Sequence, residues 1–448
     1  MSVATVVGVA CSTPNAKVTP PRAMPFEASS DPIEVKELWS RKLPGPLTDL
    51  SLSKDGNAIL VASIPDQDTG EGRYQLTRFN RNGKEIWKVP LKSQIKSQAI
   101  SADGTLAVTA NYGGDLSGID ASGKTIWTAA ASCKPILFNQ ARRILCQHDD
   151  DTVPDVAFEI FDWNGKKLSA FQSKQDLLTL KVSADETTAA LAFTGGKVIV
   201  FEMVPGKNGS DFKKVREFKV KGEILDVAIA AVAPASAGNA AGVSGIPGPV
   251  ASAAVKSRKA EKASDTEEED EADRAEWQVG VLSHSLKQGQ VISLFDSKGK
   301  LRATAEPGSH VEQLEMSSQG SELFVYGNSP KGQYLAVLLG LDRAASGKAS
   351  SKPVTLSQKW QRSDKRYADY SSSIVASDHQ VMAGFEDVEP STRNSHLVIF
   401  DLEGKMRANL ELKTEEGAYL YSYAYSPENG VLAVGTDDSK LSVFSLGK

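Results

Sequence analysis

The chain has 448 residues, of which 40% are hydrophobic and 24% are charged, and its formal net charge is −5. This composition predicts a globular protein with one large domain or several ordinary ones. No stretch approaches the roughly 20 apolar residues of a membrane-spanning helix, so nothing after the first dozen residues is expected to cross a bilayer. The net negative charge argues against a nucleic-acid binder, because neutralising phosphates requires a basic surface.

The N-terminal segment, residues 1–32, shows the order of features found in a bacterial lipoprotein signal. Residues 3–10 are mostly apolar and run into Cys11, and a stretch rich in Ser, Pro and Ala follows without a strand pattern. In a bacterium this order predicts lipidation at Cys11 and a flexible tether, and therefore a periplasmic protein anchored to the outer membrane by its lipid. The segment has no positive charge before its apolar part. The alternative is an ordinary frayed terminus, with a cytoplasmic location.

One tight turn recurs along the rest of the chain. An apolar residue, Asp or Asn, two variable residues and Gly-Lys stand at residues 79–84, 119–124, 161–166, 295–300 and 400–405. The first three copies are spaced by about 40 residues, which is the period of a repeated supersecondary unit. Glycine supplies the positive φ that a hairpin turn needs, and Asp or Asn stabilises the start of the turn with its side chain.

A second turn signature alternates with the first. Ser-x-Asp-Gly stands at residues 53–56 and 101–104, and related sequences stand at 183–186, 317–320 and 426–429, each between two short apolar runs. Two hairpin turns in each unit imply four strands, and a four-stranded unit of this period is typical of a β-propeller blade. Eight first strands are expected, which begin near residues 47, 94, 133, 177, 224, 311, 367 and 418.

The last unit supplies only three strands before the chain stops. Residues 36–45, KELWSRKLPG, match the outer strands of other units and have no earlier partners of their own. The sequence therefore predicts an all-β, eight-bladed β-propeller over residues 33–448, in which the N-terminal strand completes the last blade and removes two free sheet edges.

Residues 234–275 interrupt the fifth unit between its first and second strands. They are rich in Ala, Gly, Ser and Pro, then basic, then acidic. Such a composition buries too little apolar area to offset the entropy of ordering, so we expect a disordered insertion, with a specific docking motif as the alternative.

The remaining two thiols, Cys133 and Cys146, flank a plausible hairpin of the third unit. Cross-strand neighbours lie close enough for a disulfide, although its geometry is demanding. In an oxidising compartment we expect either a bridge between them or two buried, small apolar side chains.

The two faces of the predicted ring differ in charge. The turns between second and third strands open on one face, and they carry most of the acidic residues expected to bind a partner: Asp66, Asp68, Glu71, Asp149, Asp150, Asp151, Glu386, Asp387, Glu389, Asp437 and Asp438. The turns of the opposite face carry lysines such as Lys54, Lys84 and Lys124. An acidic face would steer a basic protein partner, whereas hydrophilic turns without a binding role are the alternative.

Signals of catalysis are weak. His148, His284, His310, His379 and His396 fall in different units without metal-ligand spacing, so each is interpreted as a surface or turn residue. The run HDDDTVPD at residues 148–155 has carboxylates that would suit Ca²⁺ but lacks the glycine and terminal glutamate of a known calcium loop, which favours a solvated turn. There is no glycine-rich phosphate loop and no Gly-x-Ser-x-Gly elbow.

Tryptophans in the outer strands, at positions 39, 87, 127 and 360, resemble those of PQQ-like propellers, and the Ser-x-Asp-Gly turns resemble those of WD40-like propellers. Quinoprotein dehydrogenases of this group carry an adjacent Cys-Cys pair, which is missing here, so the resemblance implies the scaffold without a cofactor. The chain also resembles the propeller lipoproteins of the outer-membrane β-barrel assembly machinery. That resemblance implies a non-catalytic scaffold for protein partners, monomeric within a complex. The alternative is an enzyme that uses the axial funnel, either a quinoprotein or a metal-assisted hydrolase or lyase.

Overall fold

The computed structural model of the chain describes residues 26–65, 74–148, 155–206, 209–232, 276–307, 310–328, 334–341, 356–362, 367–368, 374–376, 380–387, 394–412 and 420–447. Within these ranges the regular structure is β-strand, apart from one short 3₁₀ turn, η1 (Thr194–Gly196). No helix in the described ranges is long and apolar enough to cross a membrane. The predicted all-β class is confirmed.

The described strands form eight antiparallel sheets, numbered here in chain order with β1 in the eighth. The first four sheets each contain four consecutive strands, and these are β2 (Leu47–Leu52), β3 (Ala58–Ser63), β4 (Tyr74–Asn80) and β5 (Glu85–Leu91); β6 (Ile95–Ile100), β7 (Leu106–Asn111), β8 (Asp115–Asp120) and β9 (Thr125–Ala130); β10 (Lys134–Phe138), β11 (Arg143–Gln147), β12 (Val156–Asp162) and β13 (Lys167–Gln172); and β14 (Leu177–Val182), β15 (Thr188–Phe193), β16 (Lys197–Gly206) and β17 (Gly209–Lys219).

The other four sheets follow the same order, with two irregularities. In the seventh sheet two short strands, β26 and β27, both pair with β28, and in the eighth the outer strand comes from the N-terminus. The strands are β18 (Glu223–Val232), β19 (Glu276–Ser285), β20 (Gly289–Asp296) and β21 (Leu301–Ala305); β22 (His310–Met316), β23 (Glu322–Asn328), β24 (Tyr334–Leu341) and β25 (Leu356–Arg362); β26 (Tyr367–Ala368), β27 (Ile374–Ala376), β28 (Gln380–Asp387), β29 (Ser395–Asp401) and β30 (Met406–Leu412); and β31 (Leu420–Ser426), β32 (Val431–Thr436), β33 (Lys440–Leu446) and β1 (Val35–Lys42).

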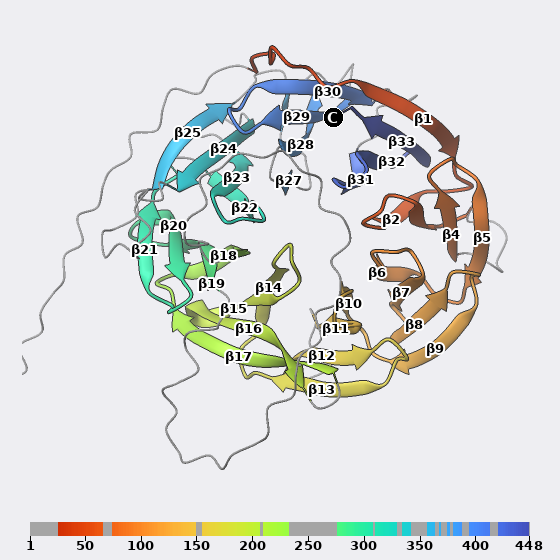
Figure 1. Cartoon of the computed structure of the whole chain (residues 1–448), viewed down its shortest axis with the longest axis horizontal. Helices are drawn as coiled ribbons and strands as arrows, with labels where there is room; N and C mark the ends of the chain where they lie inside the picture. The colour runs from red at the N-terminus through yellow and green to blue at the C-terminus, as the bar shows by residue number, and fades with distance from the viewer. Residues whose placement is uncertain are drawn as a thin grey trace, which may run out of the picture.

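The sheets are arranged as a ring around a central axis, with the first strand of each sheet innermost, which is the arrangement of a β-propeller (Figure 1). β1 pairs antiparallel with β33 from Val35 opposite Leu446 to Lys42 opposite Lys440. The predicted closure of the last sheet by the N-terminal strand is therefore confirmed. Because β1 pairs with β33, the C-terminal strand is not left as a free sheet edge.

Hydrogen bonds inside the Ser-x-Asp-Gly turns explain why that sequence recurs. In the first sheet the Ser53 hydroxyl donates to Asp55 and accepts from the backbone N–H of Ala58 at 2.9 Å, while Asp55 accepts from the N–H of Asn57 at 3.0 Å. Gly56 then takes a φ of +68°, which an L side chain would strain. The side chains thus satisfy backbone groups that the ladder leaves open at the turn.

The second turn signature connects neighbouring sheets. The indole of Trp127, in the outer strand of the second sheet, packs on Gly165 in the turn of the third, and its Nε1 donates to the carbonyl oxygen of Trp163 at 2.8 Å. Trp39, Trp87 and Trp360 contact the turn glycines of the next sheets in the same way. Four of the eight sheets therefore each supply a tryptophan that packs on a turn glycine of the sheet that follows.

The hydrophobic core lies between adjacent sheets. The second strands are the most buried: every residue of β3, β11, β15 and β32 is below a tenth exposed. The outer strands are largely exposed. Each core cluster combines residues of two neighbouring sheets, such as Ile59 and Val61 of β3 with Val431 and Ala433 of β32. One sheet alone could bury only part of its apolar surface, so stability depends on the complete ring.

Residues 26–33 lie along the seventh sheet before the chain enters β1. Phe26 contacts the rings of Phe385 and Phe400, with centroids 5.3 and 5.1 Å away, and the N–H of Ser29 donates to the carbonyl of Met406 at 2.8 Å. Glu27 pairs with the buried Arg362 at 3.5 Å. The packed part of the chain thus begins before residue 33, the predicted start of the propeller. The tether prediction stays a prediction for residues 1–25, which are outside the described residues.

Candidate functional site

The direction of the strands defines the two faces of the ring. Because neighbouring strands are antiparallel, the turns from second to third strands and the connections from outer to inner strands open on one face, which we call the entry face. Residues 112–114, between β7 and β8, are one such turn, and residues 92–94, between β5 and β6, are one such connection. The Ser-x-Asp-Gly turns and the glycine-lysine turns open on the opposite face.

Inner strands carry a bulge where they begin at the entry face. In six of them the register with the second strand skips one residue, and these residues are Thr48, Lys96, Leu178, Leu225, Glu312 and Tyr421. A bulge leaves one residue outside the ladder and turns its side chain away from the regular alternation. Leu178, Leu225 and Tyr421 are exposed as a result, although leucine is normally buried.

Exposed large apolar side chains fall into two groups among the described residues. One group lies on outer strands and comprises Leu38, Ile86, Ile126, Leu168 and Leu301. The other lies at the entry face, on inner-strand bulges and second-to-third turns, and comprises Tyr112, Leu178, Leu225, Leu286 and Tyr421. We call this second group the mouth cluster. The turns of the opposite face contribute no exposed large apolar side chain within the described residues.

Asp49 lies beside the aromatic part of the mouth cluster and joins two sheets. Its carboxylate accepts the N–H of Leu50 at 2.8 Å and the N–H of Gln98, in the neighbouring inner strand, at 2.9 Å. Burial raises the pKa of Asp49 to about 6, against these two hydrogen bonds, which lower it. Burial and the charge of Asp49 also raise the pKa of Tyr421, and the charge of Tyr112 raises it further. Tyr421, Tyr112 and Asp49 are therefore close together at the mouth.

A charged group lines the inner strands on the other side of the axis. Asp226 of β18 accepts the N–H groups of Val227 and Leu314, both at 2.8 Å, and so joins the fifth and sixth sheets as Asp49 joins the first and second. Lys181 of β14 forms an ion pair with Glu315 of β22. Burial raises the pKa of both Asp226 and Glu315, whereas Lys181 lowers it. This network was not predicted from the sequence, in which its sign is an acidic residue near the start of an apolar first strand.

The structure describes the side chains of only two of the eleven acidic residues predicted for the partner-binding face. Asp437 and Asp438 lie in the turn between β32 and β33, and Asp438 accepts from the Thr436 hydroxyl and, at 3.3 Å, from the N–H of Lys440. The backbones of Glu386 and Asp387 end β28. The remaining seven residues fall outside the described part: Asp66, Asp68, Glu71, Asp149, Asp150, Asp151 and Glu389.

Lysines also occupy the entry face. Lys92, Lys174 and Lys221 stand in connections from outer to inner strands and are exposed. These three cations were absent from the predicted charge of the face, because that prediction rested on the turns between second and third strands alone. In the described part, the entry face therefore carries acidic, basic and exposed apolar side chains.

The histidine interpretation is wrong at two positions. His148 and His396 are buried, at 4% and 8% exposure, instead of lying at the surface. His148 follows β11 directly and precedes an acidic run, which gave it the appearance of a turn residue, but its N–H still donates to the carbonyl of Ala157 at 3.1 Å and continues the ladder. His396 points inward from β29, and its Nδ1 lies 3.1 Å from Asn409 Oδ1.

Cys133 and Cys146 are joined by a disulfide, with their Cα atoms 5.3 Å apart. Both are buried in the apolar cluster between the second and third sheets. Cys11 lies outside the described residues, so its lipidation stays a prediction.

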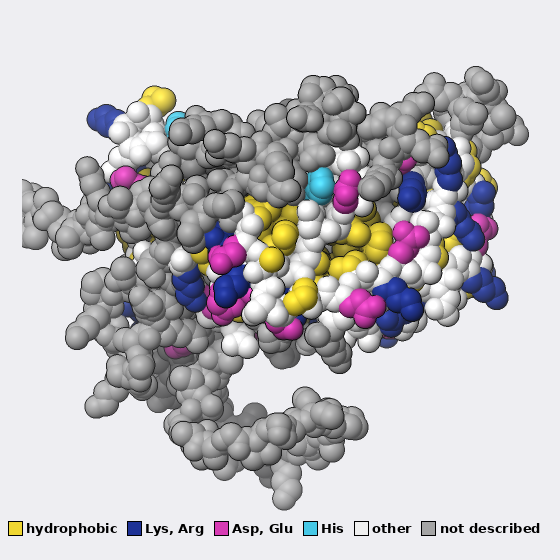
Figure 2. All heavy atoms as spheres, turned by 90° about the horizontal axis from the view of Figure 1, so that it is seen from above, with side chains coloured by type: hydrophobic (Ala, Val, Ile, Leu, Met, Phe, Trp, Pro, Cys, Tyr) yellow, Lys and Arg dark blue, Asp and Glu magenta, His cyan; other side chains and the backbone are white. Residues whose placement is uncertain are grey.

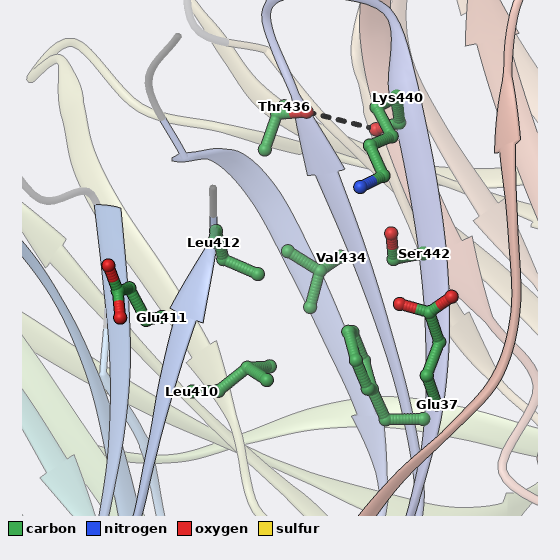
Figure 3. A pocket seen from close by; sticks show the side chains of 9 residues that line it. Glu37, Leu410, Glu411, Leu412, Val434, Thr436, Lys440 and Ser442 are labelled. Atoms are coloured by element: carbon green, nitrogen blue, oxygen red, sulfur yellow. Dashed lines mark hydrogen bonds between the residues drawn. The ribbon is translucent and has the colours of Figure 1, made fainter. Parts of the chain in front are cut away.

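A cleft of about 250 Å³ opens between β30 and the eighth sheet (Figure 3). Leu412, Val434 and Phe444 give it apolar walls, while Glu37 and Lys440 contribute opposite charges. Figure 2 views the ring from the side of β30 and β1, where apolar side chains show between charged ones. Apolar walls with a few polar groups are typical of a binding cleft.

Comparison with known proteins agrees with this architecture. Residues 72–259 match a family model described as outer membrane protein assembly factor BamB. The crystal structure of BamB from Moraxella catarrhalis matches with a TM-score of 0.52 and 12% identity, over 92% of this chain and 100% of that one. The β-propeller domain of Cps50 (Swd1) from Myceliophteria thermophila matches with a TM-score of 0.49 and 12% identity, over 92% and 99% of the two chains. No curated protein matches the sequence.

At 12% identity the BamB structure establishes the fold alone. The family match covers Gly83, Gly123 and Gly165, three of the turn glycines on which tryptophans pack. Fold and family match together confirm the predicted resemblance: the chain is a β-propeller that resembles BamB, and residues 72–259 match the model of that family.

Proposed function

We propose that this chain is a non-catalytic scaffold of the bacterial cell envelope that binds a protein partner at the entry face. The match to a family of outer membrane assembly factors supports the location and the role. The mouth cluster supports the position of the binding surface. Soluble proteins that expose grouped apolar side chains with polar neighbours commonly use them to bind other proteins.

The observation that carries the proposal is the placement of Leu178 and Leu225. They stand at equivalent bulges of the adjacent inner strands β14 and β18, and both are exposed. A regular strand would place alternate residues in the core, so the bulge is what exposes them. Burying two leucines in a partner would be worth about 1.5–3 kcal/mol for each side chain, enough to set affinity.

The finer features of the proposal rest on the sequence. The eight sheets form eight blades of one closed ring, residues 1–32 include a signal and tether with Cys11 as the lipidated residue, and residues 234–275 are a disordered insertion. The acidic turns steer a basic partner toward the apolar mouth, and the chain works as a monomer within a complex. Mass spectrometry of the N-terminal peptide checks the anchor, because an unmodified Cys11 in the native protein would remove it.

The test compares two double variants of the tagged full-length protein. Leu178→Glu with Leu225→Glu changes the mouth cluster, and Ile86→Glu with Ile126→Glu changes side chains that are similarly exposed on outer strands. Partners are captured from native membranes and quantified by mass spectrometry, after melting curves show that both variants fold. We expect the mouth variant alone to lose the proteins captured by the wild type. Equal capture by both variants would place the binding surface elsewhere.

A further inference from the structure

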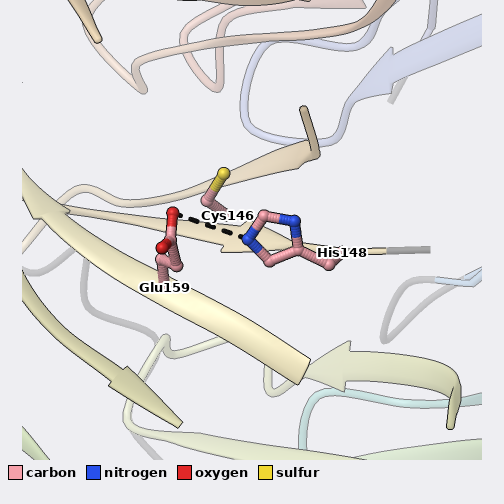
Figure 4. A group of neighbouring side chains, drawn as sticks. All are labelled: Cys146, His148 and Glu159. Carbon is pink, nitrogen blue, oxygen red and sulfur yellow. Dashed lines mark ion pairs between the residues drawn. The ribbon is translucent and has the colours of Figure 1, made fainter. Parts of the chain in front are cut away.

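Three potential metal ligands meet on one side of the third sheet. Cys146 in β11 and Glu159 in β12 are direct register partners, and His148 stands two residues after Cys146, so all three side chains point to the same side of the sheet. The Cys146 sulfur, a ring nitrogen of His148 and a carboxylate oxygen of Glu159 lie within 4.8 Å of one another (Figure 4). Their arrangement follows from strand register, and their spacing in the sequence does not reveal it.

His148 is buried without the hydrogen bonds that a buried imidazole needs. Its side chain is 1% exposed, and neither ring nitrogen makes a hydrogen bond of ordinary geometry to a described residue, although the His148 contact lowers the pKa of Glu159. Nε2 lies 3.5 Å from Glu159 Oε2, at ion-pair distance. Leaving a buried polar group unsatisfied costs about 1–3 kcal/mol, so such a group in a native core calls for an explanation such as a missing ligand.

In the oxidised chain the disulfide prevents Cys133 and Cys146 from acting as metal ligands. In the oxidised chain Cys146 is bonded to Cys133, and a disulfide sulfur does not bind zinc as a thiolate does. A dithiol reductant would convert the bridge into two thiols and become a disulfide itself. Each thiol then loses one proton as it binds the metal, so electrons and protons balance. Reduction frees the Cys146 thiolate next to His148 and Glu159, and rotation of the freed Cys133 side chain would bring the second thiolate to the same ion.

Charge and ligand type both suit zinc. Two thiolates, one imidazole and one carboxylate make a four-ligand set of the kind that binds Zn²⁺ tetrahedrally. Their three negative charges would be balanced by the ion and by Lys167, whose ammonium group already contacts Glu159. The cysteines lie in an apolar cluster with Val108 and Phe161, which keeps competing water out.

We propose that reduction of the Cys133–Cys146 disulfide creates a buried Zn²⁺ site formed by the two thiolates, His148 and Glu159. The oxidised chain lacks two of the four ligands and does not form this site. The site lies in the wall of the ring between the second and third sheets, and His148 directly precedes Asp149, Asp150 and Asp151 of the entry face.

The test uses the full chain with Cys11→Ser, which leaves only the two thiols of interest. One sample is expressed in a reducing cytosol and kept in a phosphine reductant, and the other is oxidised. Co²⁺ serves as a spectroscopic probe and Zn²⁺ is titrated in competition with a chromophoric chelator. We expect the reduced sample to bind one ion per chain and to show thiolate-to-cobalt charge-transfer absorption. The oxidised sample should show neither.

Three variants assign the ligands. His148→Ala and Glu159→Gln should each weaken Zn²⁺ binding by tenfold or more, whereas His284→Ala, at an exposed position of β19, should leave it unchanged. If the ligand variants fail to fold, zinc-edge X-ray absorption of the reduced wild type decides instead, with two sulfur and two lighter ligands expected. Equal binding by oxidised and reduced protein, or a zinc shell without sulfur, would overturn the proposal.

Discussion

The indole ring of Trp39 lies so close to Gly83 that a Cβ atom on the glycine would stand 2.8 Å from Cδ2 of the ring. Trp39 belongs to β1, in the eighth sheet, and Gly83 to the turn between β4 and β5 in the first. Trp39 Nε1 also donates to the carbonyl oxygen of Arg81 at 2.8 Å. The contact therefore connects the two sheets at the point where the ring closes, and it allows a specific test of closure.

Substituting Gly83 by Ala should destabilise the protein more than substituting Gly114. Both glycines have positive φ, +76° and +86°, so alanine is strained by about 1–2 kcal/mol at either position. At Gly114 the space around the new Cβ is open, whereas at Gly83 it meets the indole. We expect Gly83→Ala to cost about 1–3 kcal/mol beyond Gly114→Ala, because overpacking displaces Trp39.

Thermal melting of the two variants beside the wild type measures this difference. Trp39→Ala combined with Gly83→Ala is the informative third variant, because removing the ring removes the clash. If the double variant is less stable than Trp39→Ala by no more than Gly114→Ala costs the wild type, the result would support the argument. Equal melting temperatures for Gly83→Ala and Gly114→Ala would contradict it.

Truncation should distinguish the tether from the packed N-terminal segment. Removing residues 1–25 should leave the melting temperature unchanged, because the sequence predicts a tether there. Removing residues 1–33 should lower it by several degrees, because Phe26 loses its contacts with Phe385 and Phe400 and the buried Arg362 loses Glu27. Melting curves of the two truncated proteins provide the measurement, and a large loss with the shorter truncation would show that residues 1–25 also stabilise the fold.

The strands could be predicted well from the turn sequences, because the conformation of a turn depends on residues that are neighbours in the chain. The first strands expected at residues 47, 177 and 367 begin at Leu47, Leu177 and Tyr367. The pairing of β1 with β33 was also predictable, since the last unit lacked one strand and the N-terminus offered one with the right pattern.

Features that depend on contacts between units were not predictable in the same way. The tryptophans and turn glycines were each visible as repeats, but nothing inside one repeat shows that Trp127 packs on the glycine of the next. The ligand group of Cys146, His148 and Glu159 needs the register of β11 with β12, which sequence spacing does not give. The bulges that expose Leu178 and Leu225 shift one residue out of the alternation, so a period of two predicts the wrong side chain direction there.

Asp49 should make stability depend on pH in a specific window. Its pKa is about 6 in the folded protein and 3.8 when unperturbed, so the folded state holds a proton that the unfolded state has lost between these values. The contribution of Asp49 is then most favourable below about pH 4 and is lost as the pH rises through about 6. Asp49→Asn cannot ionise, so the variant should lack this part of the fall in stability, roughly 2 kcal/mol or less.

Melting temperatures of wild type and Asp49→Asn between pH 4 and 7 give the comparison. Asp226 and Glu315 have raised pKa values as well, so both proteins keep a slope from those groups, and the difference between the two curves isolates Asp49. Parallel curves would show that Asp49 does not titrate in this window.

Deleting residues 234–275 should leave the ring intact. β18 and β19 pair up to Val232 opposite Glu276, so a short glycine-containing turn can join them directly. The segment itself lies outside the described residues, and its composition predicts that the deletion removes no core. Because closure entropy changes slowly with loop length, the melting temperature should stay within a few degrees. A collapse in stability would show that the insertion packs against the ring.

The acidic turns of the entry face should act on association more than on dissociation. If Asp149, Asp150 and Asp151 steer a basic partner, their change to Asn should slow association and flatten its salt dependence, while dissociation changes little. Lys92, Lys174 and Lys221 supply the matched control, because their change to Gln on the same face should speed association of a basic partner. The kinetics are measured with the captured partner at two salt concentrations.

The alternative role for Asp149, Asp150 and Asp151 is calcium binding, and thermal melting distinguishes it from electrostatic steering of a partner. A bound ion stabilises only the folded state, so a calcium loop at residues 148–155 would raise the melting temperature in Ca²⁺ over chelator in the wild type and not in the Asn variant. Steering predicts no calcium effect in either protein. Unchanged kinetics in both the acidic and the lysine variants, without a calcium effect, would leave the mouth cluster as the support for binding at the entry face and would remove the charge argument.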